Sequence, residues 1–158
     1  MELELFSRRM VELIPQMIRG CFRQEHNSLT RGEITLPQLS VMECLARRQS
    51  LPMHEIAQQL DITRPAATGL INRLINQQLV AREHDMHDRR IVRVSITAKG
   101  RKMLSNIWNQ KRRTLERVFA QITPAERAQY LKTLERVVDI LMQQPSSKAK
   151  SRGALTKR

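Results

Sequence analysis

Aromatic residues are scarce in this chain. Phe, Trp and Tyr make up 3 % of its 158 residues, so aliphatic side chains and the 8 methionines must fill any core. Methionine suits that task because its unbranched side chain packs into irregular gaps. Apolar residues still reach 41 %, which is enough for one compact domain or a small domain with extensions.

Cysteines are also few, and their number excludes a fold held by disulfides. Cys21 and Cys44 cannot form a framework of bridges. No apolar run is long enough to cross a bilayer, so we expect no membrane partner. The acidic start of the chain lacks the basic region of a secretory signal. Together these absences predict a cytoplasmic protein in a reducing compartment.

Motifs for catalysis and metal binding are missing as well. The sequence has no Gly-rich phosphate loop and no nucleophile elbow. Its histidines match no zinc-binding spacing, and no Cys-x-x-Cys occurs. We therefore expect no enzymatic activity, no metal and no cofactor.

Positive charge, in contrast, is abundant. Lys and Arg number 28 against 15 Asp and Glu, which gives a net charge of +13. The last residues, 146–158, carry several of these bases and no acid, and their composition predicts a disordered tail. The rest of the chain is basic on its own account. Such charge attracts phosphate polyanions, membranes or acidic proteins, and charge alone does not choose among them.

Helical periodicity dominates the first third of the chain. Apolar residues recur at helical spacing over residues 2–27, where Pro15 predicts a kink or two successive helices. A loop is expected over residues 28–34. Thr35 then starts a helix as its cap, with Gln38 at the reciprocal capping-box position.

A short helix over residues 53–60 and a longer one over residues 64–78 follow, with Thr63 as the cap of the second. In the longer helix, Ala67, Leu70, Ile71 and Leu74 are expected to face inward. Its outward surface near the start is small and polar, which suits entry into a DNA major groove. The candidate DNA-binding residues of this helix are Arg64, Pro65, Ala66, Thr68, Gly69, Asn72 and Arg73.

A charged hairpin comes next. Strands are predicted over residues 79–83 and 91–96, because apolar and polar residues alternate in the second. The polar turn between them forms the tip of a wing, and its candidate DNA-binding residues are His87, Asp88, Arg89 and Arg90. Thr97 caps a long helix that ends near Ile122, and a second capping box at Thr123 starts the last helix.

These elements predict a mainly α protein with a small β-hairpin, a winged helix-turn-helix flanked by N- and C-terminal dimerisation helices. Residues 1–34 would form the N-terminal dimerisation segment and residues 35–97 the DNA-binding domain. Residues 98–145 would complete the dimerisation domain, and residues 146–158 the basic tail. The apolar stripes of the terminal helices are too large for the winged part to cover, which predicts a homodimer.

The order and spacing of these elements resemble the MarR family of bacterial transcription regulators. The residues that carry the resemblance are Leu36–Met42, Glu55–Thr63, Asn72–Leu74, Leu79–Arg82, Asp88–Arg90 and Ile96–Gly100. The resemblance implies a homodimer with interlocked terminal helices, and a helix from Arg64 that enters the major groove. It also implies that Arg90, oriented by Asp88, enters the adjacent minor groove, where negative potential is concentrated.

Three positions depart from the family pattern. His87 replaces an arginine of the wing, Gly69 stands where many relatives carry a larger polar residue, and Pro15 interrupts the first helix. The change at His87 affects an expected wing–phosphate contact, the change at Gly69 affects an expected base contact, and Pro15 affects the expected dimer interface.

The function we favour is a sequence-specific transcription regulator that binds a palindromic operator in double-stranded DNA. We favour a repressor and leave open whether a small-molecule effector releases it. Arg64 and Thr68 are expected at base edges and Arg73 at a phosphate. The alternative is a nucleoid or RNA-binding structural protein, which would bind through charge without sequence preference. An adaptor for acidic proteins would not retain DNA at all.

Some residues allow a functional and a structural interpretation. Certain relatives sense oxidants through a cysteine of the first helix, but Cys21 and Cys44 both lie on apolar faces, where a free Cys is commonly a small core residue. Residues 111–113, Lys-Arg-Arg, are interpreted as a solvated helix face. Trp108 is expected in the core, because it stands at helical spacing with Leu104.

Overall fold

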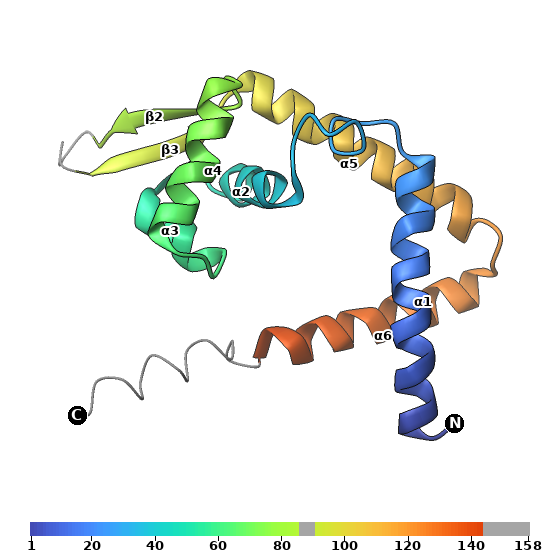
Figure 1. The fold of residues 1–158 in the computed structure, drawn as a ribbon. Helices are drawn as coiled ribbons and strands as arrows, with labels where there is room; N and C mark the ends of the chain where they lie inside the picture. The colour runs from blue at the N-terminus through green and yellow to red at the C-terminus, as the bar shows by residue number, and fades with distance from the viewer. Residues whose placement is uncertain (86–90, 144–158) are drawn as a thin grey trace, which may run out of the picture. The chain divides into compact units, whose positions relative to one another are not determined.

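The computed structural model of the chain describes residues 1–85 and 91–143. The four wing-tip candidates His87, Asp88, Arg89 and Arg90 and the tail 146–158 lie outside the described residues. The chain forms two compact units, Met1–Leu115 and Glu116–Arg158. The elements, shown in Figure 1, are α1 (Leu3–Gln24), α2 (Leu36–Arg47), β1 (Ser50–Pro52), α3 (Met53–Gln59), α4 (Arg64–Asn76), β2 (Val80–His84), β3 (Val92–Ile96), α5 (Ala98–Phe119) and α6 (Pro124–Gln143).

Helix caps fall where the sequence predicts them. The Thr35 hydroxyl accepts from the backbone N–H of Gln38, whose side-chain oxygen accepts from the Thr35 N–H at 2.8 Å. The same reciprocal pattern joins Thr123 and Glu126 ahead of α6. Each box satisfies two backbone donors that a helix start would otherwise leave unpaired.

A three-stranded antiparallel sheet has the order β1-β3-β2. The β2–β3 hairpin was expected, whereas β1 was not. Strand β1 has three residues and ends in Pro52, which is too short for an alternating pattern to show in the sequence. A proline is tolerated there because β1 is an edge strand, with one neighbour only.

The core of the first unit lies where α2, α3, α4 and the sheet meet the first half of α5. Aliphatic residues and methionine fill it, as the low aromatic content requires. The fully buried side chains include Val41, Met42, Leu45, Ile56, Ile71, Leu74, Leu79, Val94, Leu104 and Ile107. This core holds α4 beside the β2–β3 hairpin (Figure 1).

Helix α1 is a single helix of 22 residues with Pro15 inside it. The expectation of two successive helices is therefore wrong. A proline removes one hydrogen bond, but its fixed φ is close to the helical value, so the flanking turns continue through it.

Trp108 is also not a core residue, since its side chain is 43 % exposed. Its indole Nε1 donates a hydrogen bond to Glu43 Oε1 of α2 at 3.1 Å. The polar N–H needs such a partner, and a surface glutamate supplies one only if the ring stays at the edge of the core.

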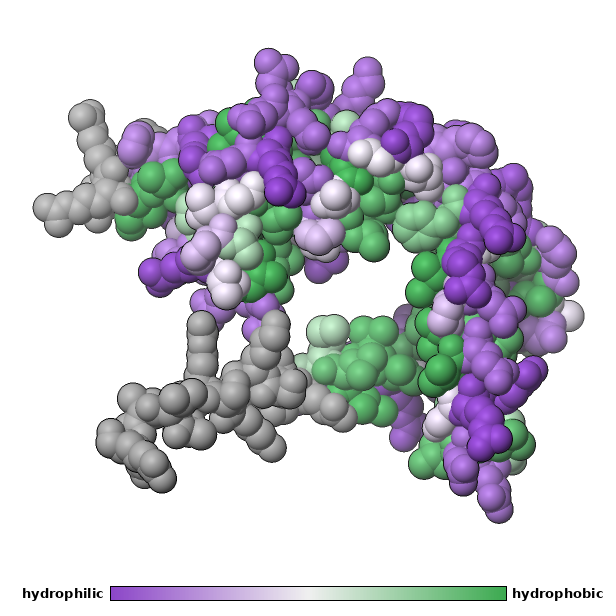
Figure 2. Space-filling view, viewed as in Figure 1, coloured by the Kyte–Doolittle hydropathy of each residue, from purple (hydrophilic) through white to green (hydrophobic). Residues whose placement is uncertain are grey.

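Helices α1 and α6 bury no residue within the chain. Figure 2 shows apolar side chains gathered along one edge of α1 and over α6. The exposed apolar residues of the two helices include Phe6, Met10, Leu13, Met17, Leu131, Leu134, Val138 and Leu141. Among the helices that the structure describes, none is long and apolar enough to cross a membrane.

Close packing of α5 against the core can be tested at Gly100. A Cβ at this position would clash with the Leu79 carbonyl oxygen and stand 2.8 Å from Ile96 Cγ1. We expect Gly100→Ala to lower the free energy of unfolding by about 1–3 kcal/mol or more, because backbone must move to admit the methyl group.

The control is Gly69→Ala, since a Cβ on Gly69 meets nothing within 4 Å. It should raise the free energy of unfolding by about 0.5–1 kcal/mol through the higher helix propensity of alanine. Urea unfolding followed by circular dichroism measures both variants. Equal changes in the free energy of unfolding for the two variants would contradict the close contact at Gly100.

Candidate nucleic-acid interface

The turn between α3 and α4 brings α4 to the surface. Asp61 has a φ of 49°, in the left-handed region that aspartate tolerates better than most residues. The chain then reverses, and the Ile62 N–H donates to the Ala57 carbonyl at 3.0 Å. Thr63 caps α4 by accepting from the Ala66 N–H at 3.3 Å. The start of α4 is therefore fixed by local hydrogen bonds.

Helix α4 has two clearly different faces. Its inner face is fully buried at Ala67, Ile71 and Leu74, while Leu70, also expected inside, is only half-buried. Of the seven candidates on the outer face, Thr68 is half-buried and the other six are exposed: Arg64, Pro65, Ala66, Gly69, Asn72 and Arg73. The structure thus brings these candidates together on one accessible surface, and their contact with DNA stays a prediction.

The hairpin beside α4 has a well-defined base. Pairing between β2 and β3 runs from Val80↔Ile96 to His84↔Val92. Beyond it, the Asp85 N–H donates to the Ile91 carbonyl at 2.9 Å. The predicted wing tip thus begins and ends at adjacent points of the ladder.

Arg93 joins the hairpin to the edge strand. Its Nε donates to Asp85 Oδ2 at 2.5 Å, and its Nη1 donates to the Ser50 carbonyl of β1 at 3.5 Å. The alternation of β3 placed Arg93 on the polar face but gave no partner for it. Asp85 lies on the other side of the same hairpin, and Ser50 belongs to the strand that was missed.

Arg82 joins the hairpin to α4. Its Nη2 donates to the Asn72 side-chain oxygen at 2.8 Å. Asn72 was a candidate for DNA contact, whereas Arg82 was not considered for any role. The bond directs the amide oxygen of Asn72 towards β2, which leaves the amide nitrogen as the group free to donate elsewhere.

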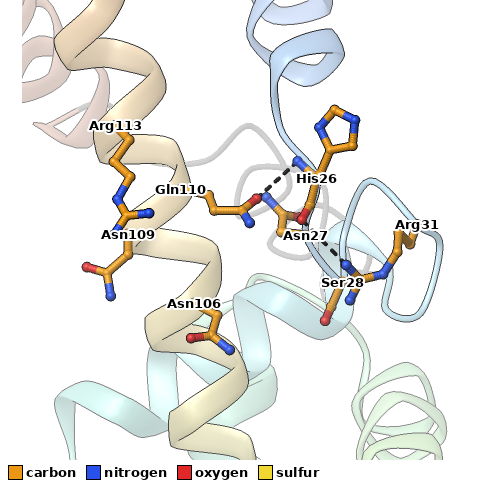
Figure 3. Close-up of a pocket in the computed structure, with 8 residues that line it drawn as sticks. All are labelled: His26, Asn27, Ser28, Arg31, Asn106, Asn109, Gln110 and Arg113. Carbon is orange, nitrogen blue, oxygen red and sulfur yellow. Dashed lines mark hydrogen bonds between the residues drawn. The ribbon is translucent and has the colours of Figure 1, made fainter.

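A polar pocket of about 220 Å³ lies between the α1–α2 loop and α5 (Figure 3). Its lining contains two arginines and no acid: His26, Asn27, Ser28 and Arg31 come from the loop, and Asn106, Asn109, Gln110 and Arg113 from α5. The His26 N–H donates to Gln110 Oε1 at 3.0 Å. Arg31 Nε donates a hydrogen bond to Glu33 Oε1 at 2.6 Å, which raises the pKa of Arg31, so this guanidinium stays charged. The sequence alone does not predict this pocket, because its loop residues and its α5 residues are about eighty positions apart.

The basic run at residues 111–113 is only partly a solvated face. Arg112 and Arg113 are exposed. Lys111, however, is half-buried, with its Nζ 5.5 Å from the centroid of the Phe22 ring and 3.9 Å from Glu25 Oε2. The buried Glu25 carboxylate needs a nearby cation, which explains why Lys111 turns inwards.

The described residues give little support to a redox role for the cysteines or to a metal site. The Cys44 thiol donates to Gln59 Oε1 at 2.9 Å, and burial raises its pKa, which disfavours the reactive thiolate. Both cysteines are free and half-buried. Within residues 1–85 and 91–143, no group of three or more His, Cys, Asp or Glu side chains is placed to hold a metal ion.

Comparison with known proteins gives consistent results. The family model described as "MarR family" matches residues 34–92. The chain is 28 % identical to the transcriptional repressor MdtR of Bacillus subtilis over 65 % of this chain and 66 % of that protein. It is 27 % identical to the homoprotocatechuate degradative operon repressor of Escherichia coli, over 68 % of this chain and 73 % of that protein.

Solved structures share the fold. YusO of Bacillus subtilis has a TM-score of 0.71 and 21 % identity, over 88 % of this chain and 99 % of that one. A mutant of S. aureus MepR bound to an oligodeoxyribonucleotide has a TM-score of 0.64 and 21 % identity, over 86 % and 97 %. BpsR of Bordetella bronchiseptica, whose DNA binding is regulated by 6-hydroxynicotinic acid, has a TM-score of 0.60 and 24 % identity, over 87 % and 94 %.

The Arg82–Asn72 bond can be tested by a double-mutant cycle. In Arg82→Met and Asn72→Ala, alone and combined, we expect a coupling in unfolding free energy of about 0.5–1.5 kcal/mol, the usual net value of one hydrogen bond. The control cycle pairs Asn72→Ala with Arg64→Met, which should be additive within about 0.5 kcal/mol. Additivity in both cycles would contradict the bond in solution.

Proposed function

Since the chain belongs to the MarR family of transcription regulators, we propose that it is a repressor that binds a palindromic operator in double-stranded DNA as a homodimer. The proposal includes release from DNA by a small molecule. The family consists of regulators rather than enzymes, in agreement with the missing catalytic motifs.

The observation that carries this proposal is the exposed outer face of α4, held beside the hairpin on a rigid core. A helix that offers small and polar side chains on its outer face can approach base edges closely. Arg64 and Thr68, near the start of α4, would meet base edges, and Arg73, further along, a phosphate. The Thr68 hydroxyl already donates to the Arg64 carbonyl at 2.9 Å, so Thr68 would offer its methyl group to a thymine.

The wing contacts are proposed on the family resemblance alone. Arg90 would enter the minor groove next to the major groove that holds α4, with Asp88 orienting it. His87 and Arg89 would lie near the DNA backbone. The described part of the hairpin ends at Asp85 and Ile91, on either side of these residues.

A second copy of the chain would cover the exposed apolar faces of α1 and α6. Exposed apolar surface of this extent usually marks an interface. We expect a homodimer at micromolar concentration, measured by sedimentation. Leu134→Lys should produce monomers, because it places a charge in the apolar face of α6, where Leu134 is 44 % exposed.

Glu135→Lys serves as the control for that variant, since it introduces the same lysine at an adjacent exposed position outside the apolar stripe. A monomeric wild type with full helix content would refute the dimer. Equal dissociation by both lysines would argue for a charge effect rather than for loss of the apolar contact.

A two-fold dimer should select an inverted repeat with half-sites about 10 bp apart, one turn of DNA. Selection from random duplexes tests this expectation.

Arg64→Ala should reduce the preference for one base at one operator position by about 1–3 kcal/mol of binding free energy. Arg73→Ala should instead weaken binding to all duplexes and reduce the slope of log affinity against log salt concentration by about 1. Recovery of no motif would favour the nucleoid or RNA-binding alternative.

The pocket between the α1–α2 loop and α5 is the proposed effector site. The Arg113 guanidinium with several amide donors fits a small organic carboxylate, while Arg31 is already paired with Glu33 and with the His26 carbonyl. The regulation of BpsR by 6-hydroxynicotinic acid provides a probe of that class. We expect 6-hydroxynicotinate or benzoate to raise the melting temperature of the wild type and to weaken DNA binding.

Arg113→Gln should remove both effects of the carboxylate. The control is Arg112→Gln, the neighbouring exposed arginine that does not line the pocket. If both variants respond like the wild type, the carboxylate binds elsewhere or not at all.

A further inference from the structure

A groove with no role so far lies between the helix-turn-helix and the outer end of the β2–β3 ladder, at Ile91 and Val92. It has a volume of about 390 Å³. We call it the saddle groove, and it is lined by Pro52, Met53, His54, Arg64, Thr68, Ile91 and Val92.

The lining of the saddle groove combines apolar residues with polar and cationic ones. Four of its residues are apolar, and the rest, His54, Arg64 and Thr68, are polar or cationic. None is acidic. Within the described part of the chain, the side chains of His54 and Arg64 have no hydrogen-bond or ion-pair partner, and both residues are exposed. Ile91, 36 % exposed, adds an accessible apolar side chain.

The place of the groove suggests what fills it. On one side is α4, proposed to enter a major groove, and on the other is β3 of the hairpin, proposed to reach the adjacent minor groove. Neighbouring major and minor grooves are separated by one sugar–phosphate strand. A protein with one element in each must therefore straddle that strand at the point between the two elements.

We propose that the saddle groove seats this sugar–phosphate strand of the operator. His54 donates a hydrogen bond to a phosphate oxygen, and Ile91 packs against a deoxyribose. The proposal rests on the proposed DNA binding. It adds contacts from His54 and Ile91 that are the same for every nucleotide, so these two residues contribute affinity and register but no base preference.

Ile91 allows a test in which folding is matched between variants. Ile91→Glu places an anion in the groove and Ile91→Lys a cation, at the same exposed position and with similar cost to folding. We expect Ile91→Glu to weaken binding at least 10-fold on both the selected operator and a random duplex, because like charges repel across a short distance. Ile91→Lys should bind both at least as tightly as the wild type.

His54→Gln tests the polar edge of the groove. Loss of one phosphate contact should weaken binding by about 2- to 10-fold on both duplexes, the range of one net hydrogen bond. Lys132→Gln, which changes an exposed cation of α6 outside the saddle groove, should leave DNA affinity unchanged.

Neutral methylphosphonate substitutions along the operator locate the contact. We expect one position in each half-site at which the neutral linkage removes the loss of affinity caused by Ile91→Glu, because the phosphate charge that repels the glutamate is no longer there. Identical affinities of the Glu and Lys variants would overturn the proposal, as would a penalty confined to one base sequence. A wild type without preference between operator and random duplex would instead overturn the proposed function, while the charge-swap comparison on random duplex would still decide the saddle groove.

Discussion

The burial of the inner face of α4 is the constraint on which the rest of the structure depends. Ala67, Ile71 and Leu74 are fully excluded from solvent, and each is an aliphatic residue in contact with a core almost devoid of aromatic rings. Side chains with few rotamers pack into such a core at high density. The outer face of α4 then needs no apolar residue for stability, which leaves it free to carry small and polar side chains.

Polar contacts add to the apolar packing that holds the hairpin, where Val80, Val94 and Ile96 are buried. Arg82 ties β2 to α4 through Asn72, and Arg93 ties β3 to the turn and to β1. The hairpin is thereby held at both of its strands. Arginine suits both positions because its guanidinium offers several donors in a fixed plane.

Much of the fold could be predicted from local signals. The caps at Thr35, Thr63 and Thr123, the inward face of α4 and the alternation of β3 depend on residues within one or two turns of each other. The structure agrees with them apart from small differences at the boundaries. Arg82, the pocket beside α5 and strand β1 could not be predicted, since each depends on partners that only the tertiary fold brings together.

Two errors have a common origin. The sequence pattern allowed two successive helices at Pro15, as the alternative to a kink, and predicted a buried Trp108. Both inferences relied on the average behaviour of a single residue type. In the structure, the continuity of the flanking turns outweighs one lost hydrogen bond at Pro15, and the indole N–H of Trp108 finds Glu43 only at the surface. The candidate site was predictable on α4, but its neighbouring contacts were not.

The start of α5 is fastened to the end of α4 and to β2. Thr97 bonds through its N–H and hydroxyl to the carbonyls of Gln78 and Leu79, and Lys99 bonds to that of Gln77. Gly100 packs against the same carbonyl of Leu79. A helix is stiff and rises about 1.5 Å per residue, so the pocket residue Gln110 lies about 15 Å along the same rod. Helix α5 therefore carries the pocket residues at one position and the attachment to the turn between α4 and β2 at another, so a single rigid element joins the two places.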